Sequence, residues 1–153
     1  MLGGTEELTP IDVDKAIAKR QDIWFGSLGA TPQRIASDIG GDALILGCRS
    51  VQVWMQDGWW LICGDTDWLN APNRAGFSGA TAFERPWALP EAGQNFHLSA
   101  VMARIFATAT ATRSGGRLEL IRGTSEDLAE FAELSAGAPH VERVVGFRFS
   151  AAA

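Results

Sequence analysis

The chain has 153 residues and a mass of 16.4 kDa, which is near the usual size of a single domain. Hydrophobic residues make up 46% of the sequence and charged residues 20%, which excludes disordered, fibrous and collagen-like chains. Eighteen acidic against thirteen basic residues give a net charge of −5, the wrong sign for a surface that neutralises phosphates. We therefore expect one globular domain, residues 1–153, that binds no nucleic acid.

We expect neither a secretion signal nor a membrane segment from this sequence. Its first residues lack a basic start and an apolar run, and the longest apolar stretch, 58–64, is too short to span a bilayer. Lys15 and Lys19 are the only lysines and the arginines are scattered, so no polybasic stripe would attract an anionic membrane. We expect a cytoplasmic protein that makes no membrane contact.

Two helices are predicted in the first part of the chain. A Thr-Pro start signal occurs at Thr9 and again at Thr31. Apolar residues at helical spacing follow both signals, which predicts helices over 10–24 and 32–39. The second helix is expected to end at the Gly-Gly pair that follows it.

A change to strand patterns follows these helices. Three apolar runs, 43–48, 51–56 and 59–64, are separated by short turn sequences. Asp57-Gly58 between the last two runs is a strong signal for a two-residue hairpin turn. We predict an antiparallel meander of three strands.

The pleat of these strands divides their side chains between two faces. The side expected to face the core carries Leu44, Leu46, Cys48, Val51, Val53, Met55, Trp60 and Ile62. The other side mixes polar and apolar residues: Ala43, Ile45, Gln52, Gln56, Cys63, Trp54, Trp59 and Leu61. Because a dry core does not accept glutamines without hydrogen-bond partners, we expect this second side to meet a binding partner.

The rest of the chain contains a long loop and further regular elements. The apolar residues of 65–95 recur at neither helical nor strand spacing, which predicts a long loop. A loop of this length is usually functional or mobile. The aromatic residues within it indicate that this loop is structured. Helices are predicted over 96–111 and from Thr124 onwards, and strands over 117–121 and 141–149. This order predicts an α+β fold with helices packed on a mostly antiparallel sheet, whose terminal strand–helix–strand unit admits a parallel crossover.

The two cysteines are expected to be free thiols. Cys48 and Cys63 are too few for a disulfide framework and have no companion at a metal-ligand spacing. In the predicted meander they lie on the outer strands and on opposite faces, at least ~9.5 Å apart, which is beyond disulfide reach. We expect no metal and no cofactor.

No complete catalytic constellation is found in the sequence. His97 and His140 are the only histidines, and neither has an acid or a nucleophile at a fixed spacing. Asp65 and Asp67 leave the third predicted strand on the same side, beside Trp68. There they could raise the pKa of one carboxyl for acid–base catalysis, hold a cation, or be ordinary strand-end residues. An enzymatic role stays open, but the sequence favours a protein without catalysis.

Six tryptophans without any tyrosine are the strongest feature of the composition. Several of them fall within the predicted meander and just after it, where they either fill the core or form a binding surface. We predict a binding surface made of Trp54, Trp59, Gln52, Gln56, Asp65, Asp67 and Trp68.

Three functions are compatible with these features. The first is a small acidic binding protein of bacterial type that acts by protein–protein contact with a basic partner, as a toxin-neutralising immunity protein or an adaptor does. The second is a small-molecule binding protein or minor enzyme with its pocket between the Trp54/Trp59 face and loop 65–95. The third is a structural domain that forms a homodimer through the same face.

Overall fold

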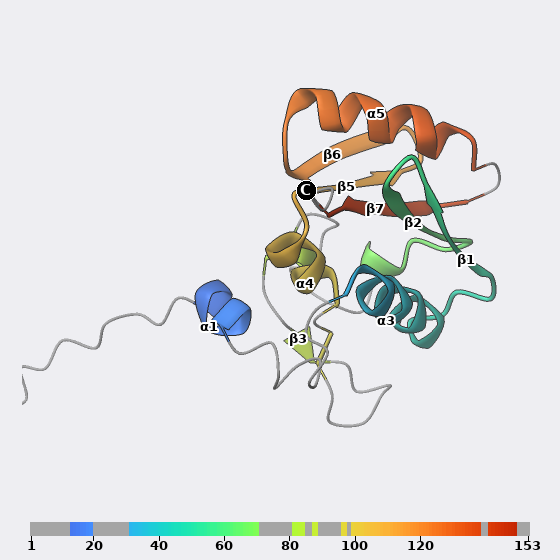
Figure 1. Cartoon of the computed structure of the whole chain (residues 1–153). Coiled ribbons are helices and arrows are strands. Elements are labelled where there is room, and N and C mark those ends of the chain that lie inside the picture. Colours follow the sequence, from blue (N-terminus) through green and yellow to red (C-terminus); the bar gives the residue numbers. More distant parts are fainter. Residues whose placement is uncertain are drawn as a thin grey trace, which may run out of the picture.

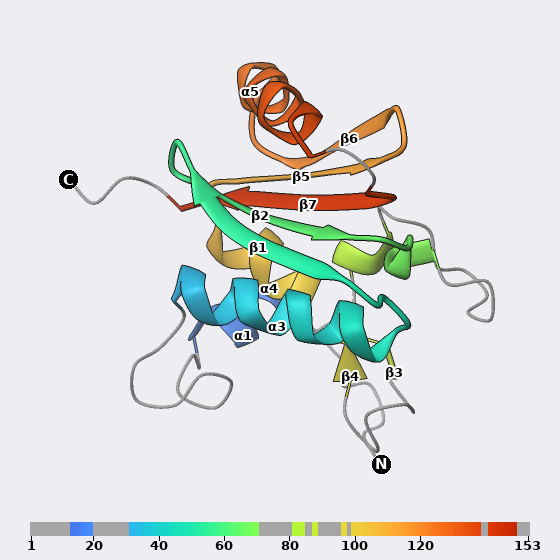
Figure 2. The same ribbon diagram turned by 90° about the vertical axis from the view of Figure 1, so that its right-hand side faces the viewer.

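The computed structural model describes residues 13–19, 31–70, 81–84, 87–88, 96–97, 99–138 and 141–149. These residues form a β-sheet between two layers of helices (Figures 1 and 2). The strands of the sheet are β1 (Val51–Gln56), β2 (Trp59–Gly64), β5 (Ala109–Ser114), β6 (Arg117–Arg122) and β7 (Arg143–Arg148). The helices are α1 (Val13–Lys19), α3 (Pro32–Ile45), α4 (Ser99–Phe106) and α5 (Ser125–Ala136). The predicted α+β class, with helices packed on a mostly antiparallel sheet, is confirmed.

The sheet has the strand order β1-β2-β7-β5-β6, and each neighbouring pair is antiparallel. β1 and β6 are therefore its two edges. β6 and β7 run in the same direction with β5 between them, so α5 connects two parallel strands that do not pair. Figure 2 shows α5 on one side of the sheet and α3 with α4 on the other.

The hairpin between β1 and β2 is formed as predicted. Asp57 and Gly58 both have positive φ angles, 53° and 83°, which is the conformation of the tight turn that an Asp-Gly pair favours. Gln56 and Trp59 face each other on either side of the turn. This register places Trp54 and Trp59 on the same face of the sheet.

The predicted strand over 43–48 is wrong, because α3 continues to Ile45. Gly40 and Gly41, which the sequence pattern places at the end of the helix, lie inside it. A Cβ atom at Gly40 would lie 3.2 Å from Cγ2 of Val53, so the missing side chain lets α3 pack closely against β1. The sheet therefore has two strands here instead of three, and β1 becomes an edge strand.

The predicted helix over 96–111 is only partly right, because α4 covers Ser99–Phe106 and the strand β5 already begins at Ala109. The Ala-Thr-Ala-Thr sequence of that strand has no strong local preference. The buried hydroxyl of Thr110 donates to the carbonyl of Ala103 at 3.1 Å, and that of Thr112 donates to the carbonyl of Val144 at 2.8 Å. Pairing with β6 and β7 decides the conformation of this segment.

Apolar side chains bury the sheet on both faces. The larger group lies against α3 and α4 and includes Ile35, Ile39, Ile62, Leu69, Phe83 and Phe147. The second group lies beneath α5 and includes Trp59, Leu61, Cys63, Phe131 and Val144. Both faces of β2 and β7 are therefore core.

The predicted division into a core side and an open side is corrected by these two layers. Ile62 and Trp60 pack on the α3 side as expected, but residues of the expected core side are exposed at 53%, 40% and 60%: Leu44, Val53 and Met55. On the expected open side, Trp59 and Leu61 have no exposed area. The reason is that α5 covers β2, while the missing third strand leaves β1 at the edge of the sheet and Leu44 on α3.

Both cysteines are free thiols, as predicted. Cys48 lies in the turn after α3 rather than on a strand, with its Sγ atom 3.1 Å from Oγ1 of Thr66. Cys63 lies in β2 on the α5 face, where burial raises the pKa of its thiol to about 12. The sheet separates the two sulfur atoms.

The segment predicted as a long loop contains short elements in its described parts. These are the 3₁₀ helices η2 (Trp68–Asn70) and η3 (Thr81–Phe83) and the start of a two-stranded sheet, β3 (Trp87–Ala88) with β4 (Phe96–His97). Trp68, Leu69 and Phe83 are buried in the α3 side core. Residues 71–80, 85–86 and 89–95 of this segment, and those of the predicted helix 10–24 that flank α1, lie outside the described residues.

Asp42 is expected to make the stability of the fold depend on pH. Its Oδ2 atom accepts a hydrogen bond from the Ser99 hydroxyl at 2.7 Å, and burial raises its pKa from 3.8 to about 6. The carboxyl of Asp42 therefore binds its proton more tightly in the folded chain than in the unfolded chain. The free energy of unfolding that the protonated form contributes is lost as the pH rises from 3.8 through about 6. Asp42→Asn should remove this loss. Urea unfolding of both proteins between about pH 4 and 7 measures the difference, and a constant difference contradicts the expectation.

Candidate functional site

Trp54 and Trp59 lie on the same face of the sheet but in different surroundings. Trp59 is fully buried beneath α5, with its ring centroid 5.7 Å from that of Phe131 and 5.4 Å from the Arg148 guanidinium. Trp54, on the edge strand, is only half-buried. Trp59 therefore belongs to the core, and Trp54 is the one of these two that a partner can reach.

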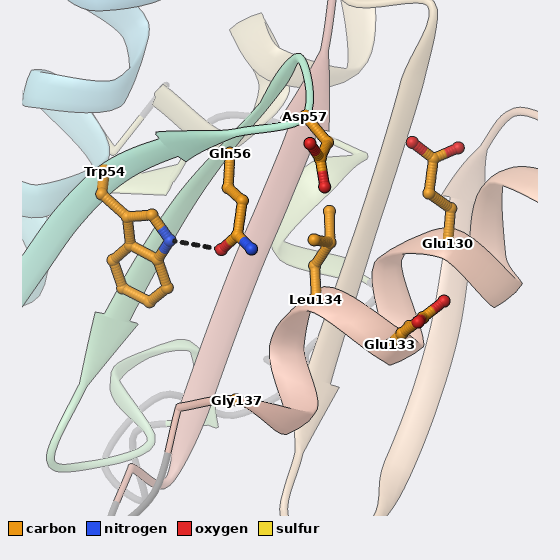
Figure 3. A pocket seen from close by; sticks show the side chains of 7 residues that line it. All are labelled: Trp54, Gln56, Asp57, Glu130, Glu133, Leu134 and Gly137. Atoms are coloured by element: carbon orange, nitrogen blue, oxygen red, sulfur yellow. Dashed lines mark hydrogen bonds between the residues drawn. The ribbon is translucent and has the colours of Figure 1, made fainter.

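A pocket of about 490 Å³ opens beside Trp54. Its walls are the end of β1 with the hairpin turn, and the side of α5 that faces them (Figure 3). In Figure 3, Leu134 projects from α5 toward the hairpin, and Nε1 of Trp54 donates to Oε1 of Gln56 at 3.4 Å. We call this pocket the Trp54 groove; it is lined by Trp54, Gln56, Asp57, Glu130, Glu133, Leu134 and Gly137.

Three carboxylates give the Trp54 groove a negative charge. Oε2 of Glu130 lies 3.3 Å from Nη1 of Arg148, a cation that Glu130 shares with Asp127. Asp57 and Glu133 have no cationic partner among the described residues. The groove thus combines an indole with two carboxylates that no cation of the described residues compensates, an arrangement that suits a cationic ligand.

The position of α5 is determined by its N-terminal cap and by Gly146. The backbone N–H of Thr124 donates to Oδ2 of Asp127 at 2.9 Å, and the backbone N–H of Asp127 donates to Oγ1 of Thr124 at 3.2 Å. The hydrogen bond from the backbone N–H of Thr124, together with the Arg148 guanidinium, lowers the pKa of the Asp127 carboxyl. Beneath the helix, a Cβ atom at Gly146 would lie 2.6 Å from two ring carbons of Phe131. Gly146 therefore lets α5 approach the sheet closely.

Asp65 and Asp67, both predicted as site residues, lie at the end of β2 opposite the hairpin turn. Oδ1 of Asp65 accepts the backbone N–H groups of Arg49 and Ser50 at 3.0 and 3.3 Å. Asp67 forms an ion pair with Arg143 at 2.7 Å. Both carboxylates therefore bind groups within the fold instead of lining the Trp54 groove.

The remaining predicted residues also separate. Trp68 is 1% exposed and belongs to the core, and its Nε1 atom has no hydrogen-bond partner among the described residues. Gln52 is exposed on β1 but does not line the groove. Of the predicted set, the structure brings together Trp54 and Gln56.

A second depression, of about 460 Å³, is lined by Asp14, Glu84, Arg104, Leu120 and Ile121. Arg104 there donates to both carboxylate oxygens of Asp14 at 2.6 and 2.7 Å, and to the carbonyl of Phe83 at 2.6 Å. The cation of this depression is thus already neutralised. The Trp54 groove is the better candidate, because Asp57 and Glu133 in it form no ion pair with any residue that the structure describes.

The described residues hold no group of three or more His, Cys, Asp or Glu side chains that could hold a metal ion. His97 lies in β4 rather than in the first turn of a helix, and His140 lies outside the described residues. Among the helices of the described part, none is long and apolar enough to cross a membrane.

The helix side of the groove was not predicted from the sequence. Glu126, Glu130 and Glu133 recur at helical spacing, so an acidic stripe on the predicted helix was visible. The face of the sheet that this helix covers depends on the strand order, which local patterns do not contain. Comparison with protein-family models, with curated proteins and with solved structures finds no match to this chain.

Proposed function

We propose that this chain is a small acidic binding protein that acts by contact with a basic protein partner, in the manner of a toxin-neutralising immunity protein or an adaptor. The observation that carries the proposal is the Trp54 groove, where an accessible indole lies with Asp57 and Glu133, which have no cationic partner among the described residues. An arginine or lysine of the partner can lie on the indole and pair with these carboxylates. The net charge of −5 attracts such a partner over a distance.

A small molecule is the second candidate ligand, because a volume of about 490 Å³ lies within the range of ligand pockets. Such pockets have mostly apolar walls, whereas this one is lined by three carboxylates and an amide. The pocket also lies against α5 and not against the described residues of loop 65–95. An aromatic anchor with a polar rim favours a protein segment as the occupant.

Photo-crosslinking in the cells that naturally express the chain tests this proposal. A photoreactive amino acid at Gln56, in the groove, is expected to form an adduct with one protein, through a segment rich in arginine or lysine that mass spectrometry identifies. The matched control is the same amino acid at Arg117, whose side chain is 82% exposed on the opposite edge strand. No adduct with that protein is expected from this position.

Two results would count against a basic protein partner. Equal yields of the adduct from Gln56 and Arg117 would mean that contact is not localised to the groove. An adduct at Gln56 whose added mass is that of a small molecule would favour the second candidate function.

A further inference from the structure

β1 is an edge strand without any feature that blocks the addition of another strand. Its sequence, Val-Gln-Val-Trp-Met-Gln, contains no charged residue and no proline, and its pairing with β2 is regular over all 6 residues. In the part of the chain that the structure describes, no strand pairs with its other side, which faces the viewer in Figure 2. Natural edge strands usually carry a lysine, a proline, a bulge or a covering element. β1 is therefore an open template for a strand of another chain.

β6, at the opposite edge, has the protection that β1 lacks. It carries Arg117, Glu119 and Arg122. Its pairing with β5 is also interrupted by a shift of register between Thr110 and Ala111. The two edges of the same sheet thus differ, and β1 is the one suited to pairing.

The backbone groups of β1 that point away from β2 are those of Val51, Val53 and Met55. In an antiparallel pair, residues that bond to the neighbouring strand alternate with residues whose N–H and C=O groups point away from it. The N–H of Asp65 donates to the carbonyl of Ser50 at 3.2 Å, so the even-numbered residues of β1 are the ones that bond to β2. The odd-numbered residues therefore offer their hydrogen-bonding groups to a new strand.

We propose that the partner segment binds by adding a strand to β1 and that basic residues alternate with apolar residues in this segment. This inference rests on the proposed function and adds the way in which the partner is recognised. Residues of the new strand opposite Trp54 and Gln56 project on the face of the Trp54 groove. Asp57 and Glu133 favour arginine or lysine at these positions. Main-chain hydrogen bonds supply affinity in this mode, and the alternating side chains supply specificity.

The opposite face of β1 accounts for the apolar half of the pattern. Val53 and Met55 project toward the α3 side of the sheet and are exposed at 40% and 60%. Residues of the new strand that lie opposite them project on the same face. Apolar side chains at these positions would remove the exposed surface of both residues from water.

Charge argues against a second copy of this chain as the occupant. Two copies that paired antiparallel through β1 would place both α5 helices on the same face of a continuous sheet. The hairpin turns of the two chains would lie at opposite ends of such a pair, so their Trp54 grooves would not meet. Each chain carries a net charge of −5, which opposes association with a second copy and favours a basic segment.

A pair of methylated peptides tests strand addition. The parent probe is an acetylated peptide of alternating arginine and valine with the length of β1, 6 residues. In antiparallel addition the valine N–H groups point to β1 and the arginine N–H groups point away. N-methylation of the valines should weaken binding by about tenfold or more, and N-methylation of the arginines should change it by less than about twofold. The parent peptide should shift the amide NMR signals of Val53 and Met55.

Each other outcome has a distinct meaning. Weaker binding on N-methylation of the arginines, instead of the valines, would support strand addition in the parallel direction. Equal binding of both methylated peptides, weakened by Glu133→Gln, would overturn strand addition and leave the proposed function standing. Failure of the parent peptide to bind at millimolar concentration would overturn the alternating segment, while crosslinking at Gln56 decides the proposed function separately. A dimeric mass of the free chain in light scattering would overturn the choice of occupant.

Discussion

Replacing Asp67 with alanine is expected to lower the free energy of unfolding by about 3–5 kcal/mol. Its carboxylate oxygens accept hydrogen bonds from Nε and Nη2 of Arg143 at 2.7 and 2.9 Å. The Arg143 side chain is only 3% exposed, and its Nη1 atom donates to Oγ1 of Thr112 at 3.0 Å. Without Asp67 this guanidinium stays buried with no compensating charge. Urea unfolding of the variant and the parent chain measures the loss.

Asp65→Ala is the matched control for this variant. It removes a carboxylate two residues away whose hydrogen bonds go to backbone N–H groups of the exposed residues Arg49 and Ser50. Because no buried charge is left behind, we expect a loss of about 1 kcal/mol. A loss at Asp67 no larger than that at Asp65 would contradict the role of Asp67 as the partner of a buried cation.

Trp59→Ala is expected to destabilise the chain by about 3–5 kcal/mol, because it opens a cavity beneath α5. The indole is fully buried against Phe131 and beneath the Arg148 guanidinium. Trp54→Ala removes the same side chain from the half-buried edge strand and should cost less than about 1.5 kcal/mol. Similar shifts of the two unfolding midpoints would show that the two tryptophans are equally buried, contrary to the structure.

Elements with a strong local signal could be predicted from the sequence. Asp57-Gly58 forms the expected turn because few other residue pairs adopt two positive φ angles so readily. Thr124 begins a helix because its hydroxyl and the Asp127 carboxylate satisfy each other's backbone N–H groups. The run 43–48 has no comparable signal, since leucine, isoleucine and alanine suit a buried helix as well as a strand. The contact of Gly40 with Val53, distant in sequence, decides between them.

The candidate site could be predicted only where it lies within one hairpin. The pleat of β1 correctly places Trp54 and Gln56 side by side. Asp67 was expected near them, but β2 carries it to the far end of the sheet, where Arg143 binds it. Glu133 could not be assigned to the site, because α5 reaches β1 only through the order in which the strands assemble.

Gly146 gives the Trp54 groove a property that none of the lining residues controls. Phe131 rests where a Cβ atom at Gly146 would be, so the volume at this position sets the height of α5 above the sheet. The same height sets the gap between α5 and β1, which is the width of the groove. A related chain with a larger residue at position 146 would bind a bulkier side chain of the partner beside an unchanged Trp54. The selectivity of the groove for its partner can thus change through a buried position beneath α5 that the partner does not contact.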